Sequence, residues 1–216
     1  PPNDGNGFLP SLNPDLPTPP KVSLIVKQDQ TGKWRDDNGE DWTHMISGSQ
    51  AALSGRIQGW KLLDHDITVI DTDTNQVSYV SGLMNIGMAL AFNKAKNEIT
   101  LVGTDAINEI RYEPLLNGIF VRAHIGIVAE NNINNPLIKD LNPHLDYLSS
   151  SVEQSIRDES IGDPRGIVWR ADGNTGYVSG MGSNNVIMID SNGNRLNKIE
   201  VGEGATGLAL DENHNR

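Results

Sequence analysis

The stretch "DPRGIVWRADGNTGYVSGMGSNNVIMID", residues 163–190, alternates three short apolar segments with polar turns. The segments hold Ile and Val, which favour strands, and the turns hold Gly, Asn and Asp. The pattern predicts three antiparallel strands joined by tight turns. The run "GMGSNNV" at 180–186 also suggests a phosphate-binding loop, but it lacks the Lys-Ser/Thr ending and precedes a strand instead of a helix. A turn between strands is therefore favoured.

Part of this pattern is repeated elsewhere in the chain. The segment "ITVIDTDTNQVSYVSGLMNIGMALAFN" (67–93) aligns with "VIMIDSNGNRLNKIEVGEGATGLALDE" (186–212). In both, apolar residues lead to an Ile-Asp pair, Ile70-Asp71 or Ile189-Asp190, and a polar turn and a second strand follow. An internal repeat of this kind is typical of folds in which similar units stack on one another.

The spacing of three glycines gives the length of the unit. Gly87, Gly166 and Gly207 each open a strand of small or apolar residues. Gly166 and Gly207 lie about 41 residues apart, which is the length of one four-stranded propeller blade. Gly87 and Gly166 are about two such periods apart, and we assign the excess to a loop insertion at 132–162. The chain is predicted to be all-β, with about two to three four-stranded blades of a β-propeller.

The predicted ring is incomplete. A propeller closes with about four to eight blades, and a single blade cannot bury both of its faces. The chain holds about two to three predicted blades, fewer than a closed ring needs. We therefore expect the missing blades to come from the rest of the same polypeptide or from neighbouring subunits, including copies of this chain.

The N-terminal part has a different character. Residues 1–21 contain most of the 11 prolines and are predicted to form an extended linker or tail, with the partial propeller over 22–216. The sequence "KVSLIVK" predicts a first strand. After it, Asn38-Gly39 marks a tight turn between Trp34 and Trp42, which predicts a hairpin with both tryptophans on a core.

Charge and composition exclude several functions. Lys and Arg number 17 against 28 Asp and Glu, so the net charge is -11, which disfavours nucleic acid and anionic membrane surfaces as partners. No apolar run is long enough for membrane insertion. The absence of Cys excludes disulfides, thiolate nucleophiles, Cys-ligated zinc and covalently attached haem within this chain.

Two acidic turns have the spacing of oxygen ligands for calcium. Asp37, Asn38 and Asp41 lie in "DDNGED", and Asp71 and Asp73 lie in "DTDTNQ". Neither turn has the Gly and Glu positions of an EF-hand. The alternative for both is a strand-to-strand turn capped by Asp side chains. Calcium is the metal that this acidic, Cys-free chain suits best.

His144 is the candidate cofactor ligand, because "NPHLDY" lies in the insertion, where functional residues tend to occur. With Asp146 it could form an oriented pair or an axial ligand of haem or of a metal. The alternative is a histidine that hydrogen-bonds the loop backbone. The stretch Ser149 to Ser160 predicts a short helix.

No catalytic residues are predicted. The chain has no Gly-x-Ser-x-Gly motif and no His-Glu-x-x-His motif, and nothing selects a pair of carboxylates. Arg111 and Glu113, in the expected strand "NEIRYEP", and Arg122, in "FVRAH", are predicted to form cross-strand ion pairs.

The stretch at 163–190, with "KIEVGEGATGLALDE" after it, resembles the YVTN-type β-propeller repeat. That repeat has a Pro-x-Gly start, a "DG…YV" second strand and a "SNxVxVID" third strand. Tyr177-Val178 stand at the Tyr-Val position, whereas Ser179-Gly180 replace the usual Thr-Asn. The phrases "SLIVKQDQTGKWRDDNGEDW", "DHDITVID", "TDAINEIRYEP" and "LNPHLDY" resemble large exported bacterial propeller proteins, over about residues 22–216.

The resemblance implies a fold and says little about activity. It implies a non-catalytic binding or scaffold module in the periplasm, outside the cell or on the bacterial cell surface. Many proteins of this kind carry Cys-x-x-Cys-His or cytochrome-peroxidase-like segments. The alternative is therefore the propeller portion of a haem-containing redox enzyme, with the haem in a cytochrome-like domain outside this chain.

Overall fold

The computed structural model describes residues 25–54, 63–108 and 117–214. The strands are, in chain order, β1 (Lys27–Gln28), β2 (Trp34–Arg35), β3 (Ile67–Ile70), β4 (Val77–Val80), β5 (Ile86–Asn93), β6 (Glu98–Ala106), β7 (Val121–Ala129), β8 (Leu137–Asp140), β9 (Pro164–Trp169), β10 (Thr175–Gly180), β11 (Asn185–Asp190) and β12 (Arg195–Glu200). The helices are α1 (Thr43–Ile46), η1 (Ala51–Ser54), α2 (Gln154–Arg157) and η2 (Glu212–His214). The linker predicted at 1–21 and most of the strand "NEIRYEP" lie outside the described residues.

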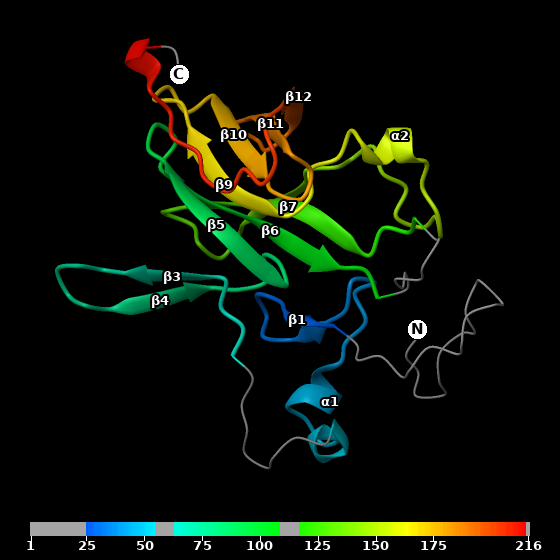
Figure 1. Ribbon diagram of the computed structural model, residues 1–216. Helices are drawn as coiled ribbons and strands as arrows, with labels where there is room; N and C mark the ends of the chain where they lie inside the picture. The colour runs from blue at the N-terminus through cyan, green and yellow to red at the C-terminus, as the bar shows by residue number, and fades with distance from the viewer. Residues whose placement is uncertain (1–24, 55–62, 109–116, 215–216) are drawn as a thin grey trace.

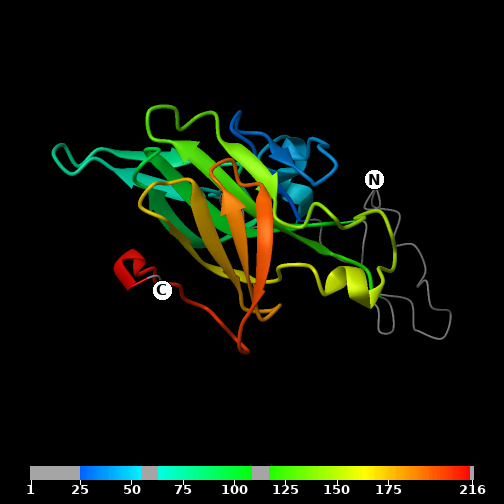
Figure 2. The ribbon, with the colours of Figure 1, turned by 90° about the horizontal axis from the view of Figure 1, so that it is seen from above.

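The all-β prediction is confirmed. Within the described ranges the strands form four antiparallel sheets, two of them four-stranded, with the strand orders β5-β6-β7-β8 and β9-β10-β11-β12. Each four-stranded sheet is a simple meander of consecutive strands, which is the strand order of a propeller blade. Figures 1 and 2 show these two sheets stacked on each other. The quoted stretch 163–190 forms β9, β10 and β11, as predicted.

The connections differ between the two ends of the strands in these sheets. Each end is called an edge here, in the sense of the rim where connections lie. On one edge, here called the turn edge, the connections 94–97, 170–174 and 191–194 are tight turns. At Gly173, φ is +69° and an added Cβ would lie 2.4 Å from Asn93 Oδ1, so the turn requires glycine. On the opposite edge, the loop edge, the segments between β6 and β7 (107–120, of which 109–116 lie outside the described residues) and between β8 and β9 (141–163) are long. The loop edge therefore has the capacity for a binding site.

The main core lies between the two four-stranded sheets. Alternation along the strands places Val102, Ile125 and Ile127 on one sheet and Ile187 and Ile189 on the other, all buried in one cluster. The indole N–H of Trp169 also donates to Thr100 Oγ1 across the interface at 3.0 Å. Ala89 and Ala91, small residues of the strand that Gly87 was predicted to open, also pack against this cluster.

A second core covers the other face of the β5–β8 sheet. Ile67 and Val80 of the β3–β4 hairpin pack there with Leu83, Met84 and Leu101. The hairpin covers only part of the sheet, because Leu90 and Phe92 of β5, on the same face, remain 55% and 49% exposed.

The tight turn predicted at Asn38-Gly39 is present and an isolated bridge between Arg35 and Asp41 closes it, but the chain then enters α1, so the predicted hairpin has no second strand. Gly39 N–H donates to the Asp36 carbonyl at 3.1 Å, and Trp42 N–H donates to the Trp34 carbonyl at 2.7 Å. Trp34 is buried, whereas Trp42 is half-buried and donates its indole N–H to Asp36 Oδ2 at 2.9 Å. One tryptophan is thus a core residue and the other closes the turn.

Two segments differ from the repeat as it was predicted. Strand β8 lies within the segment 132–162 that the spacing assigned to an insertion. The segment 207–211 lies beside β9, because an added Cβ at Gly166 would meet Thr206 O at 3.0 Å, yet it forms no strand. A strand needs a neighbour to pair with its N–H and C=O groups, and 207–211 has none in the described part of the chain.

None of the helices in the described ranges is long and apolar enough to cross a membrane.

Candidate functional site

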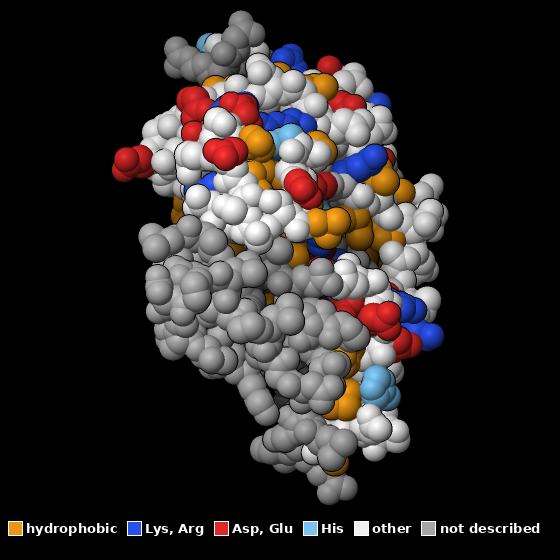
Figure 3. Space-filling view, turned by 90° about the vertical axis from the view of Figure 1, so that its right-hand side faces the viewer, with side chains coloured by type: hydrophobic (Ala, Val, Ile, Leu, Met, Phe, Trp, Pro, Cys, Tyr) orange, Lys and Arg blue, Asp and Glu red, His pale blue; other side chains and the backbone are white. Residues whose placement is uncertain are grey.

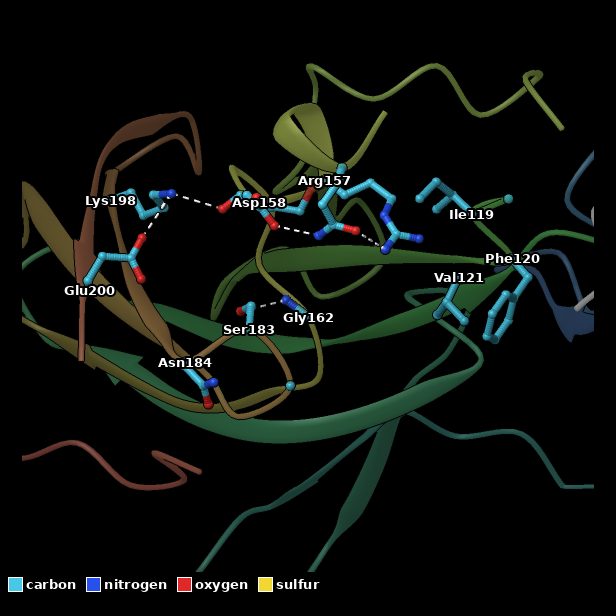
Figure 4. A pocket seen from close by; sticks show the side chains of 14 residues that line it. Ile119, Phe120, Val121, Arg157, Asp158, Gly162, Ser183, Asn184, Lys198 and Glu200 are labelled. Carbon is cyan, nitrogen blue, oxygen red and sulfur yellow. Dashed lines mark hydrogen bonds and ion pairs between the residues drawn. The ribbon is translucent and has the colours of Figure 1, made fainter. Parts of the chain in front are cut away.

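A hollow of about 760 Å³ opens at the loop edge. It lies where the two long connections meet the β10–β11 turn and the end of β12 (Figure 4). Its lining residues are Gly118, Ile119, Phe120, Val121, Gln154, Arg157, Asp158, Ser160, Gly162, Gly182, Ser183, Asn184, Lys198 and Glu200. Both four-stranded sheets therefore contribute to one concave surface.

Hydrogen bonds hold the 141–163 connection in place around the hollow. Asn142 bridges it, because its side-chain amide donates to the Ile161 carbonyl at 2.8 Å and its Oδ1 accepts the Ile161 N–H at 2.8 Å. On α2, Arg157 donates to Gln154 Oε1 at 2.6 Å and to Asn117 Oδ1 at 3.1 Å. The last bond joins the two long connections to each other.

Lys198 is the central cation of the opposite wall. Its Nζ lies 2.8 Å from the Asp158 carbonyl, 3.1 Å from Glu159 Oε1 and 2.9 Å from Glu200 Oε1. The hydrogen bond with Glu200, together with that to Glu159, raises the pKa of Lys198. Figure 3 faces this side of the molecule, where acidic and basic side chains are interspersed around apolar ones.

A second cavity, of about 420 Å³, lies between the β5–β8 sheet and the segment that contains β1, β2 and the turn after β2. At its base, Asp105 Oδ2 lies 2.7 Å from Lys27 Nζ and 2.9 Å from His124 Nδ1, and Asp105 Oδ1 accepts the Asn85 N–H at 2.8 Å. Burial acts to raise the pKa of Asp105, but the bonds from His124 and Lys27 outweigh it and the pKa is lowered. Asp105 thus ties β1 to the sheet as a carboxylate.

Tyr147 forms another wall of this cavity. Its hydroxyl donates to Asp140 Oδ1 at 2.9 Å, and the Arg122 guanidinium lies 4.8 Å from the centre of its ring. Burial and the nearby Asp140 charge raise the pKa of the Tyr147 hydroxyl. Arg122 also faces Asp37, at 3.8 Å. Arg111 and Glu113, which were predicted to form cross-strand ion pairs with Arg122, lie outside the described residues.

The sequence contains a pattern that indicates the cluster of Asp105, Arg122 and His124. In β7, Arg122 and His124 alternate with the buried Ala123 and Ile125, so both polar side chains share one face. The register pairs Asp105 with Arg122. Polar residues at alternate positions of an otherwise apolar strand thus indicate a site, once the partner strand is known.

The residues proposed for calcium in "DDNGED" are occupied by protein contacts. Asp37 Oδ1 accepts the Asn108 side-chain amide at 2.7 Å, and Asn38 N–H donates to Asp36 Oδ1 at 3.0 Å. Asp41 pairs with Lys33 at 3.3 Å, and hydrogen bonding from Thr43 lowers the pKa of Asp41 to about 2. Asp36 and Asp41 thus cap local turns, whereas Asp37 bonds the remote Asn108.

The turn "DTDTNQ" is also self-capped. Asp71 Oδ1 accepts the N–H groups of Asp73 and Thr74 at 3.0 and 2.8 Å, and the Asp73 side chain is exposed. No group of three or more potential metal ligands lies within the described ranges. Calcium binding therefore stays a prediction, as does a haem outside this chain.

His144 lies on the 141–163 connection, with its Nε2 3.1 Å from Ser160 Oγ. Burial, followed by the Arg195 charge, lowers the pKa of His144. Asp146, its expected partner, accepts the Leu148 N–H at 3.0 Å. The contact with Ser160 indicates a histidine that stabilises the loop, and its role as a cofactor ligand stays a prediction.

Comparison with known proteins adds little to these observations. No protein-family model and no curated protein matches the chain. Among solved structures it is similar to a chain of "Kuenenia stuttgartiensis Hydrazine Synthase", with a TM-score of 0.47 and 12% sequence identity over 64% of this chain and 43% of that chain. This chain thus spans less than half of that neighbour. A similarity of this extent establishes neither a shared fold nor a shared function, and the YVTN-type repeat stays a prediction.

Proposed function

We propose that this chain is part of a β-propeller and serves as a non-catalytic binding module of an exported bacterial protein, with the loop edge as its binding face. The observation that carries the proposal is the position of the connections 107–120 and 141–163. Both leave the same edge, and both line the hollow. Long connections in a compact fold are usually functional, and binding residues concentrate on loops that a rigid scaffold positions.

Exposed apolar residues support the propeller part of the proposal. Leu90 and Phe92 on β5 and Tyr79 on β4 are about half exposed. In the β9–β12 sheet, two inner strands, β9 and β10, adjoin the outer pair β11–β12. Equivalent strands beside β3 would cover Leu90 and Phe92, and a further blade would cover Tyr79 on the outer face of β3–β4. We assign them to the rest of the same polypeptide or to a neighbouring subunit.

A pair of matched variants tests the binding face. Glu200→Trp places a large ring in the hollow, and Glu130→Trp makes the same change at the turn edge, where Glu130 is exposed. The purified wild type and both variants are immobilised and exposed to an envelope extract of the source bacterium. We expect the wild type and Glu130→Trp to retain the same component and Glu200→Trp to lose it. Equal retention by all three would contradict the proposal.

A further inference from the structure

Two charged side chains that line the hollow, Arg157 and Asp158, are held by the same neutral amide. Gln154 accepts from Arg157 through its Oε1 at 2.6 Å and donates through its Nε2 to Asp158 Oδ1 at 2.5 Å (Figure 4). Arg157 also donates to Asn117 Oδ1 at 3.1 Å. These partners are all neutral, so neither charge is compensated by an ion pair within the described ranges.

The guanidinium of Arg157 has unused donors. Of the five N–H groups of an arginine, two bond to Asn117 and Gln154. Its Nε is buried and has no hydrogen-bond partner in the described part of the chain. A ligand would therefore bond to the terminal nitrogens. Because the charge is delocalised over the planar guanidinium, a carboxylate bound there would compensate the whole group.

Lys198, the other cation of the lining, is in the opposite situation. An ammonium group has three donors, and three acceptors of the protein lie within 3.1 Å of Lys198 Nζ. Two of these acceptors are the carboxylates of Glu159 and Glu200. The charge of Lys198 is thus already paired, and Arg157 is the lining residue that is suited to a ligand anion.

Asp158 is a matching anion for the same ligand. It is exposed, and its second carboxylate oxygen has no hydrogen-bond partner in the described ranges. A ligand with a carboxylate alone would bring a negative charge close to Asp158, because Arg157 and Asp158 bond to opposite ends of one amide. An ammonium group on the ligand would replace this repulsion by an attraction. The pair therefore favours a zwitterion.

We infer that the hollow binds an α-amino acid with an apolar side chain. The ammonium and carboxylate of such a ligand are joined through a single carbon atom, as are the N and O of the Gln154 amide that spans Arg157 and Asp158. The ligand would use the free N–H groups of Arg157 and the second oxygen of Asp158, so both bonds of Gln154 would remain.

The rest of the hollow suits the rest of this ligand. Ile119 and Val121 belong to the lining and offer apolar surface to the ligand side chain. The volume of about 760 Å³ leaves room for the whole amino acid. This inference rests on the proposed function, because it names the ligand class of the same binding face.

Matched probes test the need for both charges. Leucine, isoleucine, valine, methionine and phenylalanine are first compared by calorimetry with the full chain. The best binder is then compared with its own analogues without the ammonium or without the carboxylate, which for leucine are isocaproate and isoamylamine. We expect the amino acid to bind about tenfold or more tightly than either analogue. An analogue that binds as tightly, or the absence of binding by all five amino acids, would overturn the inference.

Variants locate the ligand in the hollow. Arg157→Gln should weaken binding of the amino acid and of its carboxylate analogue, whereas Asp158→Asn should weaken binding of the amino acid alone, in each case by about tenfold. Because Asp158 is exposed, Asp158→Asn keeps the test decisive if Arg157→Gln does not fold. The control is Arg170→Gln, which removes an arginine that pairs with Glu212 at the turn edge and should bind as the wild type does. Unchanged affinity in either folded variant of the hollow would contradict the assignment.

The variant Glu200→Trp separates this inference from the proposed function. If it loses both the captured envelope component and the amino acid, both are supported. If capture depends on Glu200 but no amino acid binds, the loop edge is a binding face for another ligand class and only the amino-acid assignment fails. If the amino acid binds through Arg157 but capture does not depend on Glu200, the assignment is supported and the envelope component binds elsewhere. If neither result is obtained, both fail.

Discussion

The hairpins β3–β4 and β11–β12 come from equivalent parts of the internal repeat, and their turns have the same chemistry. Each turn begins at the Asp of an Ile-Asp pair. The side chain of Asp71, like that of Asp190, accepts two backbone N–H groups of its own turn through Oδ1, at 2.8–3.0 Å. Each turn is therefore capped by its own first residue, although the turns differ in sequence and length: Asp71 N–H donates to the Gln76 carbonyl, whereas Asp190 N–H donates to the Asn194 carbonyl.

The isoleucines before those turns have different environments. Ile189 is completely buried, whereas Ile70 is 58% exposed. Strand β11 lies between β10 and β12 and faces the β5–β8 sheet, whereas β3 is paired only with β4 in the described ranges. Burial thus depends on strands remote in sequence. The exposed face of β3–β4 is the position at which a further blade would pack, in the propeller that we propose.

Truncating the two isoleucines gives the largest expected contrast. Ile189→Ala should lower the free energy of unfolding by about 2–5 kcal/mol, because it leaves a cavity in the core between the sheets. Ile70→Ala should change it by less than about 0.5 kcal/mol, as is usual for exposed positions. Urea unfolding followed by circular dichroism measures both.

A large loss for Ile70→Ala would show that this face is covered in solution. If the loss grew with protein concentration, copies of the chain would supply the cover. A loss independent of concentration would instead place other residues of the same chain over β3.

The same contrast explains which features of the fold could be predicted from the sequence. Strands β9, β10 and β11 and their turns follow from local patterns, because apolar alternation and turn residues act over a few positions. The 41-residue spacing also places Gly166 at the start of a strand. Gly166 lies in β9, where the close approach of Thr206 and Ser179 leaves no room for a Cβ.

What could not be predicted depends on contacts between remote segments. Phe120, just before β7, and Lys198, in β12, line one hollow although they are remote in sequence. Asp105 and His124 meet only through the register of β6 and β7. The segment 207–211 has strand-forming residues but no pairing partner among the described residues, so its local pattern predicted a strand that does not form there. Site residues of this kind require the fold first.

Replacing the capping Asp of each turn tests whether the similar hydrogen bonds of the two turns contribute to the free energy of unfolding in a similar way. Asp190→Ala should lower the free energy of unfolding by about 1 kcal/mol at pH 7, because two backbone N–H groups lose their acceptor. Burial acts to raise the pKa of Asp190, but the hydrogen bonds from Asn194 and Asn192 lower it overall. Its ionised form is thus favoured in the folded state.

The contribution of Asp190 should accordingly be present above the unfolded pKa and be lost as the pH falls through the lower, folded value. Unfolding curves at pH 7 and pH 3 should show the cost of Asp190→Ala shrinking in acid. Asp71→Ala should show the same trend with a smaller effect, because its carboxylate is fully exposed and its pKa is also lowered, mainly by the Thr74 N–H. A cost that does not change with pH would contradict the capping role.

Asp66 anchors the β3–β4 hairpin. Its contribution to stability should change with pH in the opposite sense to that of Asp190, and this effect should be the smallest. Asp66 accepts the N–H groups of Leu83 and Met84 at 2.9 and 3.3 Å, but burial raises its pKa above the ordinary value. The folded chain therefore binds this proton more tightly than the unfolded chain does. That contribution to stability is complete below the unfolded pKa and is lost as the pH rises through the folded one.

Asp66→Asn removes the titration while keeping one acceptor oxygen. The difference in free energy of unfolding between wild type and variant should be larger at pH 3.5 than at pH 7, by less than about 1 kcal/mol. Urea titrations across this range, with Asp190→Ala beside it, should give slopes of opposite sign. If both variants follow the same trend, the pH dependence reflects the net charge of the chain, and the half-buried position of Asp66 at the start of the hairpin has no separate effect.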